Sequence, residues 1–573
     1  MKTIYQFSLI LALFASACSS DLMDKMPLDK FSESAVWNDL NLTEAYVNYQ
    51  YKVLPKIGWY EWIRAHQLGT FTDETVHKYG YNNVQDYWRG LMGPSLVTGI
   101  DVWRYHYQFI KGCNVFLQSI DKVPANSDDE KDKKARMEGE IYALRAWSYM
   151  DLAARYGGVV LVTEPFELDD DFARERSSFD ETVDLVIDDL DKAIALLPES
   201  YSGDKDWGRI TKGAAMAMKS RMLLYAASPL FNTSNDKSKW TAAAEAAKKV
   251  IDLGLYVLEP DYKQLFLENK NDEIILSRGN DNINDDGYFG YFGVVEGVGG
   301  GIDGNGYASG WSTSMVTQNM VDAFEMIDGT PFDWNNPEHR ANPYKNRDPR
   351  FDASVTHDGT SWIADSLIQF WICEKSNNYT KNPFDSDFEI DYTVYGRNSV
   401  GNPGQRQDCP EMGYIYQKAM NPKYDTNAEQ YPYSVPWIIF RYAEILLNYA
   451  EALYESGGSE DIVRTYLNQV RSRVGMPKIT ASGSELRKKI QHERRIELCF
   501  EAHRYFDARR WKTAVEDFSQ PAKGIRIVKD KSSDKMVYNV FEFQQRTWPE
   551  KYYLQPIPQY ELDKISLNQN PGY

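Results

Sequence analysis

Eight segments of the chain place apolar residues every three or four positions, and this spacing constrains the fold more than any other feature. One face of an α-helix has that period, so each segment predicts an amphipathic helix with one buried side. In the first segment Ile141, Leu144 and Leu152 share a face, and Gly157-Gly158 ends the run, as glycine commonly does. The eight segments are residues 135–156, 180–197, 212–225, 240–253, 436–455, 461–474, 484–500 and 503–511.

The eight segments fall into four successive pairs of helices. Pairs of this length resemble tetratricopeptide hairpins, which stack so that neighbouring pairs bury a shared face. Between the second and third pairs, residues 271–430 are rich in Gly, Asn, Asp and Pro. That composition predicts loops, short strands and a few helices, such as one over residues 314–326. We therefore expect a mainly α-helical scaffold, at residues 35–270 and 431–573, that carries a loop-rich lobe at 271–430.

The charge balance excludes one large class of partner. The chain has 83 acidic against 64 basic side chains, and its formal net charge is −19. Neutralising the phosphates of a nucleic acid requires a basic surface, so we expect no nucleic-acid partner. The hydrophobic content of 43% is that of a globular protein and excludes disorder of the whole chain.

The N-terminus predicts export. A basic start precedes an apolar run that is too short to cross a bilayer of roughly 30 Å, so residues 1–17 are interpreted as a signal peptide. Cleavage before Cys18 leaves two alternatives. Ordinary cleavage would give a soluble secreted protein, whereas small residues directly before a cysteine resemble a bacterial lipobox and predict acylation of Cys18. We favour lipidation, with residues 18–34 as a polar tether.

Once Cys18 is used for lipidation, four cysteines remain. Two of them, Cys113 and Cys499, occupy apolar helical positions and are interpreted as buried small hydrophobic residues. The other two, Cys373 and Cys409, share one irregular region. They are either buried thiols as well or partners in a disulfide.

No motif for catalysis or for a bound cofactor has the context that its chemistry needs. Residues 299–304 match the glycine spacing of a dinucleotide-binding loop but lack a βαβ context. Residues 282–287 resemble the start of a calcium loop, although the twelfth position is Gly293 instead of a bidentate glutamate. We predict no enzyme, no cofactor and no metal centre. A structural calcium ion of another geometry stays an alternative at Asp281, Asp285 or Asp286.

Aromatic residues gather in two polar, loop-like segments. Residues 79–89 combine Tyr and Trp with Asn, Asp and Arg, and residues 287–292 combine Tyr and Phe with Gly. Flat rings cover the C–H faces of sugars, while amide, carboxylate and guanidinium groups bind the hydroxyls. Core packing is the alternative for each ring. We expect a ligand site where residues 73–89 meet residues 280–311, formed by Trp88, Trp311, Tyr87, Tyr288, Tyr291, Asp73, Asn83 and Arg89.

Several stretches, by their order and spacing, resemble the SusD/RagB family of bacterial outer-membrane lipoproteins. They are residues 143–149 (ALRAWSY), 155–159 (RYGGV), 224–231 (LYAASPLF), 441–447 (RYAEILL), 493–498 (ERRIEL), 503–507 (HRYFD), 554–558 (LQPIP) and 568–573 (NQNPGY). The resemblance implies that residues 35–573 form one SusD-like domain with four tetratricopeptide-like units. It also implies a non-catalytic surface lipoprotein that captures nutrient, most often glycan, and delivers it to a SusC-like TonB-dependent transporter.

The resemblance transfers no binding residue, because the sites of this family vary between members. Lipoboxes usually carry Leu where this chain has Ala15, and residues 19–21 are weakly acidic as a surface-export tag, so the periplasmic face stays an alternative to the cell surface. Peptide or another nutrient stays an alternative to glycan. The charged residues within the resembling stretches are interpreted as helix-packing ion pairs: Arg145, Arg441, Glu444, Arg494, Arg495 and Arg504.

Overall fold

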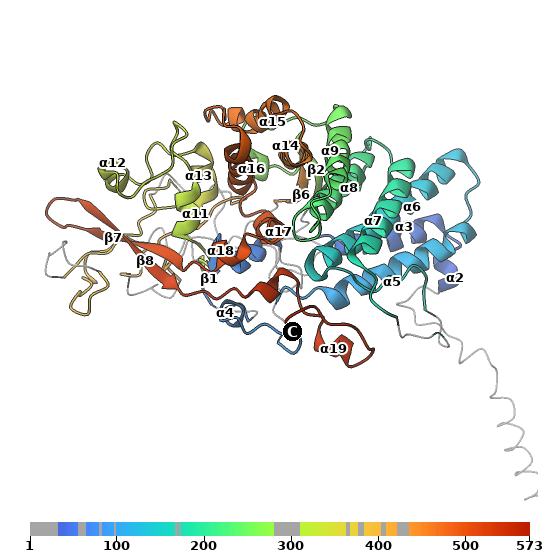
Figure 1. Ribbon diagram of the computed structural model, residues 1–573, viewed down its shortest axis with the longest axis horizontal. Coiled ribbons are helices and arrows are strands. Elements are labelled where there is room, and N and C mark those ends of the chain that lie inside the picture. The colour runs from blue at the N-terminus through green and yellow to red at the C-terminus, as the bar shows by residue number, and fades with distance from the viewer. Residues whose placement is uncertain are drawn as a thin grey trace, which may run out of the picture.

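Long helices gather at one side of the molecule, and short helices and strands gather at the other (Figure 1). The prediction of a mainly α-helical fold is confirmed. In the described part of the chain, no helix is both long and apolar enough to cross a membrane. The computed structural model describes residues 33–55, 65–79, 83–96, 99–166, 170, 174–279, 310–361, 367–375, 383–402, 408–420 and 435–573.

The scaffold is an array of helices in which successive members lie side by side. The helices are α2 (Glu33–Val36), α3 (Leu40–Gln50), α5 (Trp103–Ser119), α6 (Asp128–Tyr156), α7 (Phe179–Leu196), α8 (Lys212–Ala227), α9 (Lys237–Asp252), α14 (Tyr442–Ser456), α15 (Glu460–Arg473), α16 (Gly483–Glu497) and α17 (His503–Arg510). Each of α5 to α8 packs on the next helix, and α9 then packs on α14. The largest hydrophobic cluster fills the space between these helices, for example at Leu144, Met218 and Ala247. Residues 271–430 therefore separate α9 from α14 in sequence but not in space.

Helix α6 begins at Asp128 and α7 at Phe179, earlier than their apolar period predicts. At the start of α6, the Ser127 hydroxyl accepts the N–H of Glu130, and the Glu130 carboxylate accepts the N–H of Ser127. Ser178 and Glu181 form the same reciprocal arrangement at α7. These capping boxes satisfy backbone N–H groups that the first turn of a helix leaves without an internal partner. The Ser-x-x-Glu spacing is visible in the sequence and is the information that would have placed both starts.

The predicted helix over residues 436–455 is wrong at its beginning. Residues 437–441 form strand β6 (Trp437–Arg441), which pairs antiparallel with β2 (Ile274–Arg278), and helix α14 begins only at Tyr442. All five residues of β6 are buried, and a fully buried strand is a continuous apolar run that periodicity cannot distinguish from a helix.

Two further predictions of helical structure need correction. Residues 314–326 form strand β3 (Ser314–Val316) and the short helix α11 (Gln318–Ala323), which begins where the Thr317 hydroxyl accepts the N–H of Met320. The last predicted pair does not pack as a hairpin. Helix α16 packs on α14 and α15, whereas α17 packs on α18 (Ala514–Phe518) and on the 3₁₀ helix η3 (Ala65–Phe71).

Short elements form the other side of the molecule. They are α12 (Pro337–Ala341), α13 (Pro349–Ser354), β4 (Val355–Thr356), β5 (Ile415–Tyr416), β7 (Ala522–Lys529) and β8 (Met536–Gln544). The β7–β8 hairpin comes from the C-terminal part of the chain, yet β7 packs on α11 and β8 on α12. Further short elements are β1 (Thr75–His77), α4 (Val84–Trp88), α19 (Gln559–Leu562) and the 3₁₀ helices η2 (Tyr51–Val53), η4 (Ile120–Lys122), η5 (Asp204–Asp206), η6 (Gln264–Phe266) and η8 (Glu550–Tyr553).

Buried ion pairs join the helices, as the sequence interpretation expected. Arg145 on α6 makes a two-pronged contact with Asp189 on α7, at 2.7 and 2.8 Å. Arg221 on α8 contacts Glu444 on α14 at 2.6 Å. Both pairs are almost fully buried, so they tie neighbouring helices to one another instead of facing a ligand. The other charged residues singled out in the sequence pair in the same way: Arg441 with Glu273, Glu497 and Glu501, Arg494 with Asp507, Arg495 with Asp73, and Arg504 with Asp73 and Asp517.

None of the four cysteines Cys113, Cys373, Cys409 and Cys499 forms a disulfide, and all four are buried. The disulfide alternative for Cys373 and Cys409 is therefore wrong. Burial raises the pKa of the Cys113, Cys409 and Cys499 thiols to about 12, so they stay protonated at neutral pH and behave as small core residues.

Candidate ligand-binding site

The segment that precedes α4 meets the segment that precedes α11 in a two-stranded antiparallel sheet. Strand β1 pairs with β3, with Thr75 opposite Val316 and His77 opposite Ser314. The ladder continues by one bond, because the N–H of Lys78 donates to the carbonyl of Thr313. This pairing brings Tyr79 next to Trp311, two residues more than 200 positions apart.

Tyr79 and Trp311 form the exposed edge of this junction. The Tyr79 side chain is 37% exposed, and its hydroxyl lies 3.2 Å from the carbonyl oxygen of Trp311 and 3.1 Å from Oδ1 of Asp408. The Trp311 side chain is half-buried. The ammonium of the neighbouring Lys78 donates to the carbonyl of Cys409 at 2.6 Å and lies 5.7 Å from the centre of the Tyr79 ring. Burial lowers the pKa of Lys78, and the acids Glu411 and Asp408 partly oppose this effect.

Tyr79, Lys78 and Asp408 are missing from the residues that the sequence predicted for the site. Tyr79 belongs to the aromatic segment 79–89, and its position directly after a short strand could have singled it out. No local pattern connects Asp408 to this segment, because the two are brought together only by the tertiary fold.

Trp88 and Tyr87 lie in the core, which corrects their prediction as ligand-stacking rings. Trp88 is 2% exposed, its indole N–H donates to the carbonyl of Thr70 at 3.0 Å, and the guanidinium of Arg546 covers its ring at 3.8 Å. Tyr87 is 1% exposed, and its hydroxyl accepts the indole N–H of Trp548 at 2.6 Å. The polar residues around them in sequence lie on the outer side of the five-residue helix α4, so polar neighbours did not indicate an exposed ring.

Asp73 is a buried ion-pair partner and not a hydroxyl-binding group at the surface. Its two oxygens contact Arg504 at 2.8 and 2.9 Å, and Arg495 at 2.9 Å. Burial alone would raise the pKa of Asp73, but these guanidinium groups outweigh it and hold the pKa well below its usual range. Asp73 thus fixes β1 to helices α16 and α17.

The neighbouring carboxyl of Glu74 shifts in the opposite direction. Burial raises its pKa to about 7, and the charge of Asp73 adds to this effect. One oxygen accepts the N–H of Phe500 at 3.1 Å. No group of the described residues bonds to the other oxygen. The charged form of Glu74 is therefore destabilised by burial, because the two nearby arginines contact Asp73 and not Glu74.

Replacing Glu74 with glutamine should stabilise the protein at alkaline pH. Because the folded-state pKa is raised, the wild type carries no penalty below about pH 4.5, and it loses stability as the pH rises towards 7. The gain in unfolding free energy on Glu74→Gln should be about 3 kcal/mol at pH 8 and close to zero at pH 4. Denaturant titrations at the two pH values measure it, with the exposed Glu485→Gln as control. A gain that is equal at both pH values would contradict the assignment.

The remaining predicted residues are either exposed or outside the described part of the chain. Asn83 is exposed and adopts the left-handed conformation directly before α4, with φ 57°. Arg89 is exposed at the end of α4, where it contacts Asp86 at 3.5 Å. The ring candidates Tyr288 and Tyr291, the calcium candidates Asp281, Asp285 and Asp286, and the lipidation residue Cys18 lie outside the described residues. Within the described ranges, no group of three or more acidic, His or Cys side chains could hold a metal ion.

Known proteins similar to this chain share its full architecture. A family model described as "SusD family" matches residues 272–573, and one described as "Starch-binding associating with outer membrane" matches residues 28–224. A SusD-like protein from Bacteroides fragilis has 31% sequence identity and a TM-score of 0.75, over 96% of this chain and 100% of that one. A SusD-like carbohydrate binding protein from the same species has 23% identity and a TM-score of 0.73, over 93% and 99%. A SusD-like protein from Formosa agariphila is 24% identical over 76% of either chain.

Proposed function

The chain belongs to the SusD family of non-catalytic, carbohydrate-binding proteins, and from this premise we propose that it captures oligosaccharide or polysaccharide at the outer membrane. The observation that supports the proposal is the junction of β1 and β3. There an exposed tyrosine and a half-buried tryptophan stand beside a carboxylate and an ammonium group. Rings of this kind cover the C–H faces of a sugar, and the charged groups bind its hydroxyls. Asn83 and Arg89 remain candidates for the rim of the same site.

The proposal extends to the anchor and to the fate of the ligand. Acylation of Cys18 would hold the protein on the outer membrane, and residues 18–34 would let the folded domain stand away from the lipid. The captured glycan would then pass to a SusC-like TonB-dependent transporter. One of the matching family models is described as associating with the outer membrane, which supports the location.

Replacing Trp311 with alanine should reduce glycan affinity by about tenfold or more and leave the melting temperature nearly unchanged, because a half-exposed ring contributes little to the core. Isothermal titration against maltohexaose, laminarihexaose, cellohexaose and xylohexaose would first identify the hexasaccharide that binds. The same titration on Trp311→Ala then measures the loss. Tyr49→Ala is the control, since Tyr49 is 49% exposed on α3, outside the β1–β3 junction.

Peptide is the second candidate ligand. A peptide panel in the same titration distinguishes the two, because a SusD-like scaffold that carries peptide would bind the peptides and none of the four hexasaccharides. Trp311→Ala that binds the selected hexasaccharide as tightly as the wild type would show that the site lies elsewhere.

A further inference from the structure

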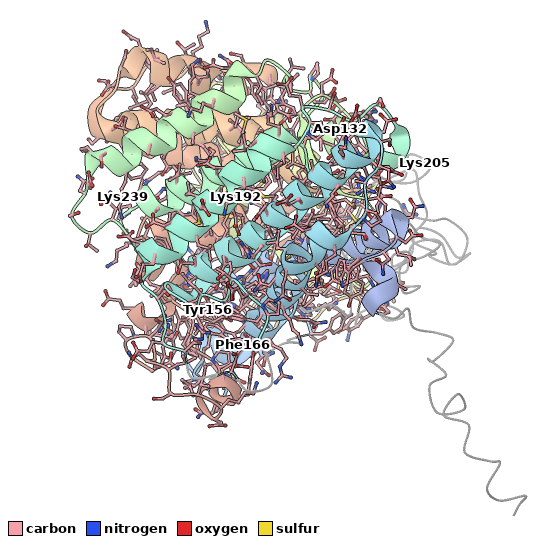
Figure 2. All side chains as sticks on the ribbon, turned by 90° about the vertical axis from the view of Figure 1, so that its right-hand side faces the viewer. Asp132, Tyr156, Phe166, Lys192, Lys205 and Lys239 are labelled. Carbon is pink, nitrogen blue, oxygen red and sulfur yellow. The ribbon has the colours of Figure 1, made fainter. Side chains whose placement is uncertain are left out.

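An exposed tryptophan lies at the edge of the helical scaffold, on a segment that takes no part in the β1–β3 junction. Trp207 follows η5 and precedes α8, and 38% of its side chain is exposed. Figure 2 labels Lys205, two residues before it, at the outer edge of the helix array.

Two hollows meet at the Trp207 side chain. The first has a volume of about 320 Å³ and lies between the residues after α7, the residues after α9 and the start of β2. The second has a volume of about 280 Å³ and lies towards α3 and the end of β2. Trp207, Gly208, Arg209 and Ser277 line both. The first hollow is within the size range of small-molecule sites, and the second extends it past the indole.

The loop that carries Trp207 is fixed against β2 and the helical scaffold. Gly208 has φ +89°, and a Cβ at this position would stand 3.3 Å from the carbonyl oxygen of Ser277, so the loop can lie this close to β2 only with glycine. Arg209 then fixes the loop to the scaffold by contacts with Asp206 at 2.7 Å, Glu140 at 3.1 Å and Glu44 at 3.3 Å. A ring that is already ordered loses little conformational entropy when a ligand stacks on it.

The groups around the first hollow suit hydroxyls better than they suit an ionic ligand. Glu199 and Asp272 are exposed carboxylates on its rim, and the ammonium of Lys270 stands 5.1 Å from the Trp207 ring. The positive charge of this ammonium opposes a cationic ligand at the indole. The two carboxylates oppose an anion. Ser277 is 2% exposed, and its hydroxyl has no hydrogen-bond partner among the described residues.

We propose that the Trp207 hollows form a second saccharide site, separate from the one at Trp311. A sugar ring stacks on the indole, Glu199 and Asp272 accept hydrogen bonds from its hydroxyls, and Lys270 donates one. The inference rests on the proposed function in one respect, the chemical class of the ligand. It assigns no role to the β1–β3 junction and could hold if that junction bound nothing.

The test follows each tryptophan separately. The full-length protein is labelled with 5-fluorotryptophan, and the resonance of residue 207 is identified as the one missing from Trp207→Phe. The four hexasaccharides named above are then titrated into the wild type, Trp207→Ala, Trp311→Ala and Tyr49→Ala. Tyr49→Ala is a matched control, because Lys52 stands 5.2 Å from the Tyr49 ring as Lys270 does from Trp207, but Tyr49 lines neither hollow.

The expected result is two ligands per chain in the wild type, one in Trp207→Ala, and a shift of the residue 207 resonance that persists in Trp311→Ala. Tyr49→Ala should behave as the wild type. A stoichiometry of one with an unmoved residue 207 resonance would overturn the second site and leave the proposed function intact. A shifting residue 207 resonance with Trp311→Ala unaffected would support the second site and overturn the proposed one. Absence of binding to all four sugars would overturn both.

Discussion

Trp88→Ala is expected to lower the free energy of unfolding by about 3–5 kcal/mol, the usual cost of truncating a large aromatic side chain in a core. The cost should be at the upper end of that range. The substitution leaves a cavity among Phe518, Tyr87 and the Arg546 guanidinium. It also removes the donor to the carbonyl of Thr70 and the ring that covers Arg546. Arg546 is a buried cation that donates to the backbone carbonyls of Thr72 and Thr75 and to the side-chain oxygen of Gln544.

Chemical denaturation compares the stability of Trp88→Ala with that of Trp311→Ala. The two substitutions remove the same side chain, one from a buried and one from a half-buried position. Trp88→Ala should lose stability and, where it remains folded, bind glycan with wild-type affinity. Arg89→Ala, at the adjacent exposed position, should unfold like the wild type. If Trp88→Ala lost glycan affinity at unchanged stability, its assignment to the core would be wrong.

Glu497→Gln should destabilise the protein by about 3–5 kcal/mol, because it removes a carboxylate that three buried arginines share. Glu497 on α16 accepts from Arg441 at 2.6 Å and from Arg350 at 2.9 Å, and it also pairs with Arg473. Burial opposes ionisation of this carboxyl, but the three guanidinium groups outweigh it and hold its pKa well below the usual range. The amide of glutamine keeps the shape and removes the charge.

Thermal and urea unfolding would measure the effect, with Glu485→Gln as the matched control on the same helix. Glu485 pairs with Lys488, and both side chains are more than half exposed, so this pair should contribute little. Equal stability of the two variants would show that solvent screens the Glu497 cluster as well. The Arg441→Met variant extends the test. It replaces one of the three cations with an apolar side chain and should leave Glu497 paired with Arg350 and Arg473.

Sequence periodicity predicted the long helices α6 to α9 because their buried faces repeat over several turns, but α5 (Trp103–Ser119) was not among the predicted segments. It failed where the apolar run was short and buried on all sides, as at Trp437–Arg441, since such a run has no period to read. The Ser-x-x-Glu spacing of the capping boxes at Ser127 and Ser178 was visible in the sequence and would have placed the first residue of both helices.

The sequence predicted the meeting of two segments more accurately than the burial of the residues in them. The meeting of residues 73–89 with the segment before α11 agrees with the β1–β3 pairing, and Trp311 lies at that junction. Trp88 and Tyr87 were misassigned because composition reports which residue types are near in sequence, whereas their burial depends on Arg546, Trp548 and other residues from the far end of the chain. Asp408 could not have been found, for the same reason.

The partners of α4 also fix an order of events during synthesis. Tyr87 receives the indole N–H of Trp548, the N–H of Met92 donates to the hydroxyl of Tyr552, and the carbonyl of Trp88 accepts the N–H of Thr547. A nascent chain that ends before residue 546 therefore cannot close the core beneath α4, however long the earlier helices have had to form. Completion of the fold therefore waits until the last residues of the chain have left the ribosome.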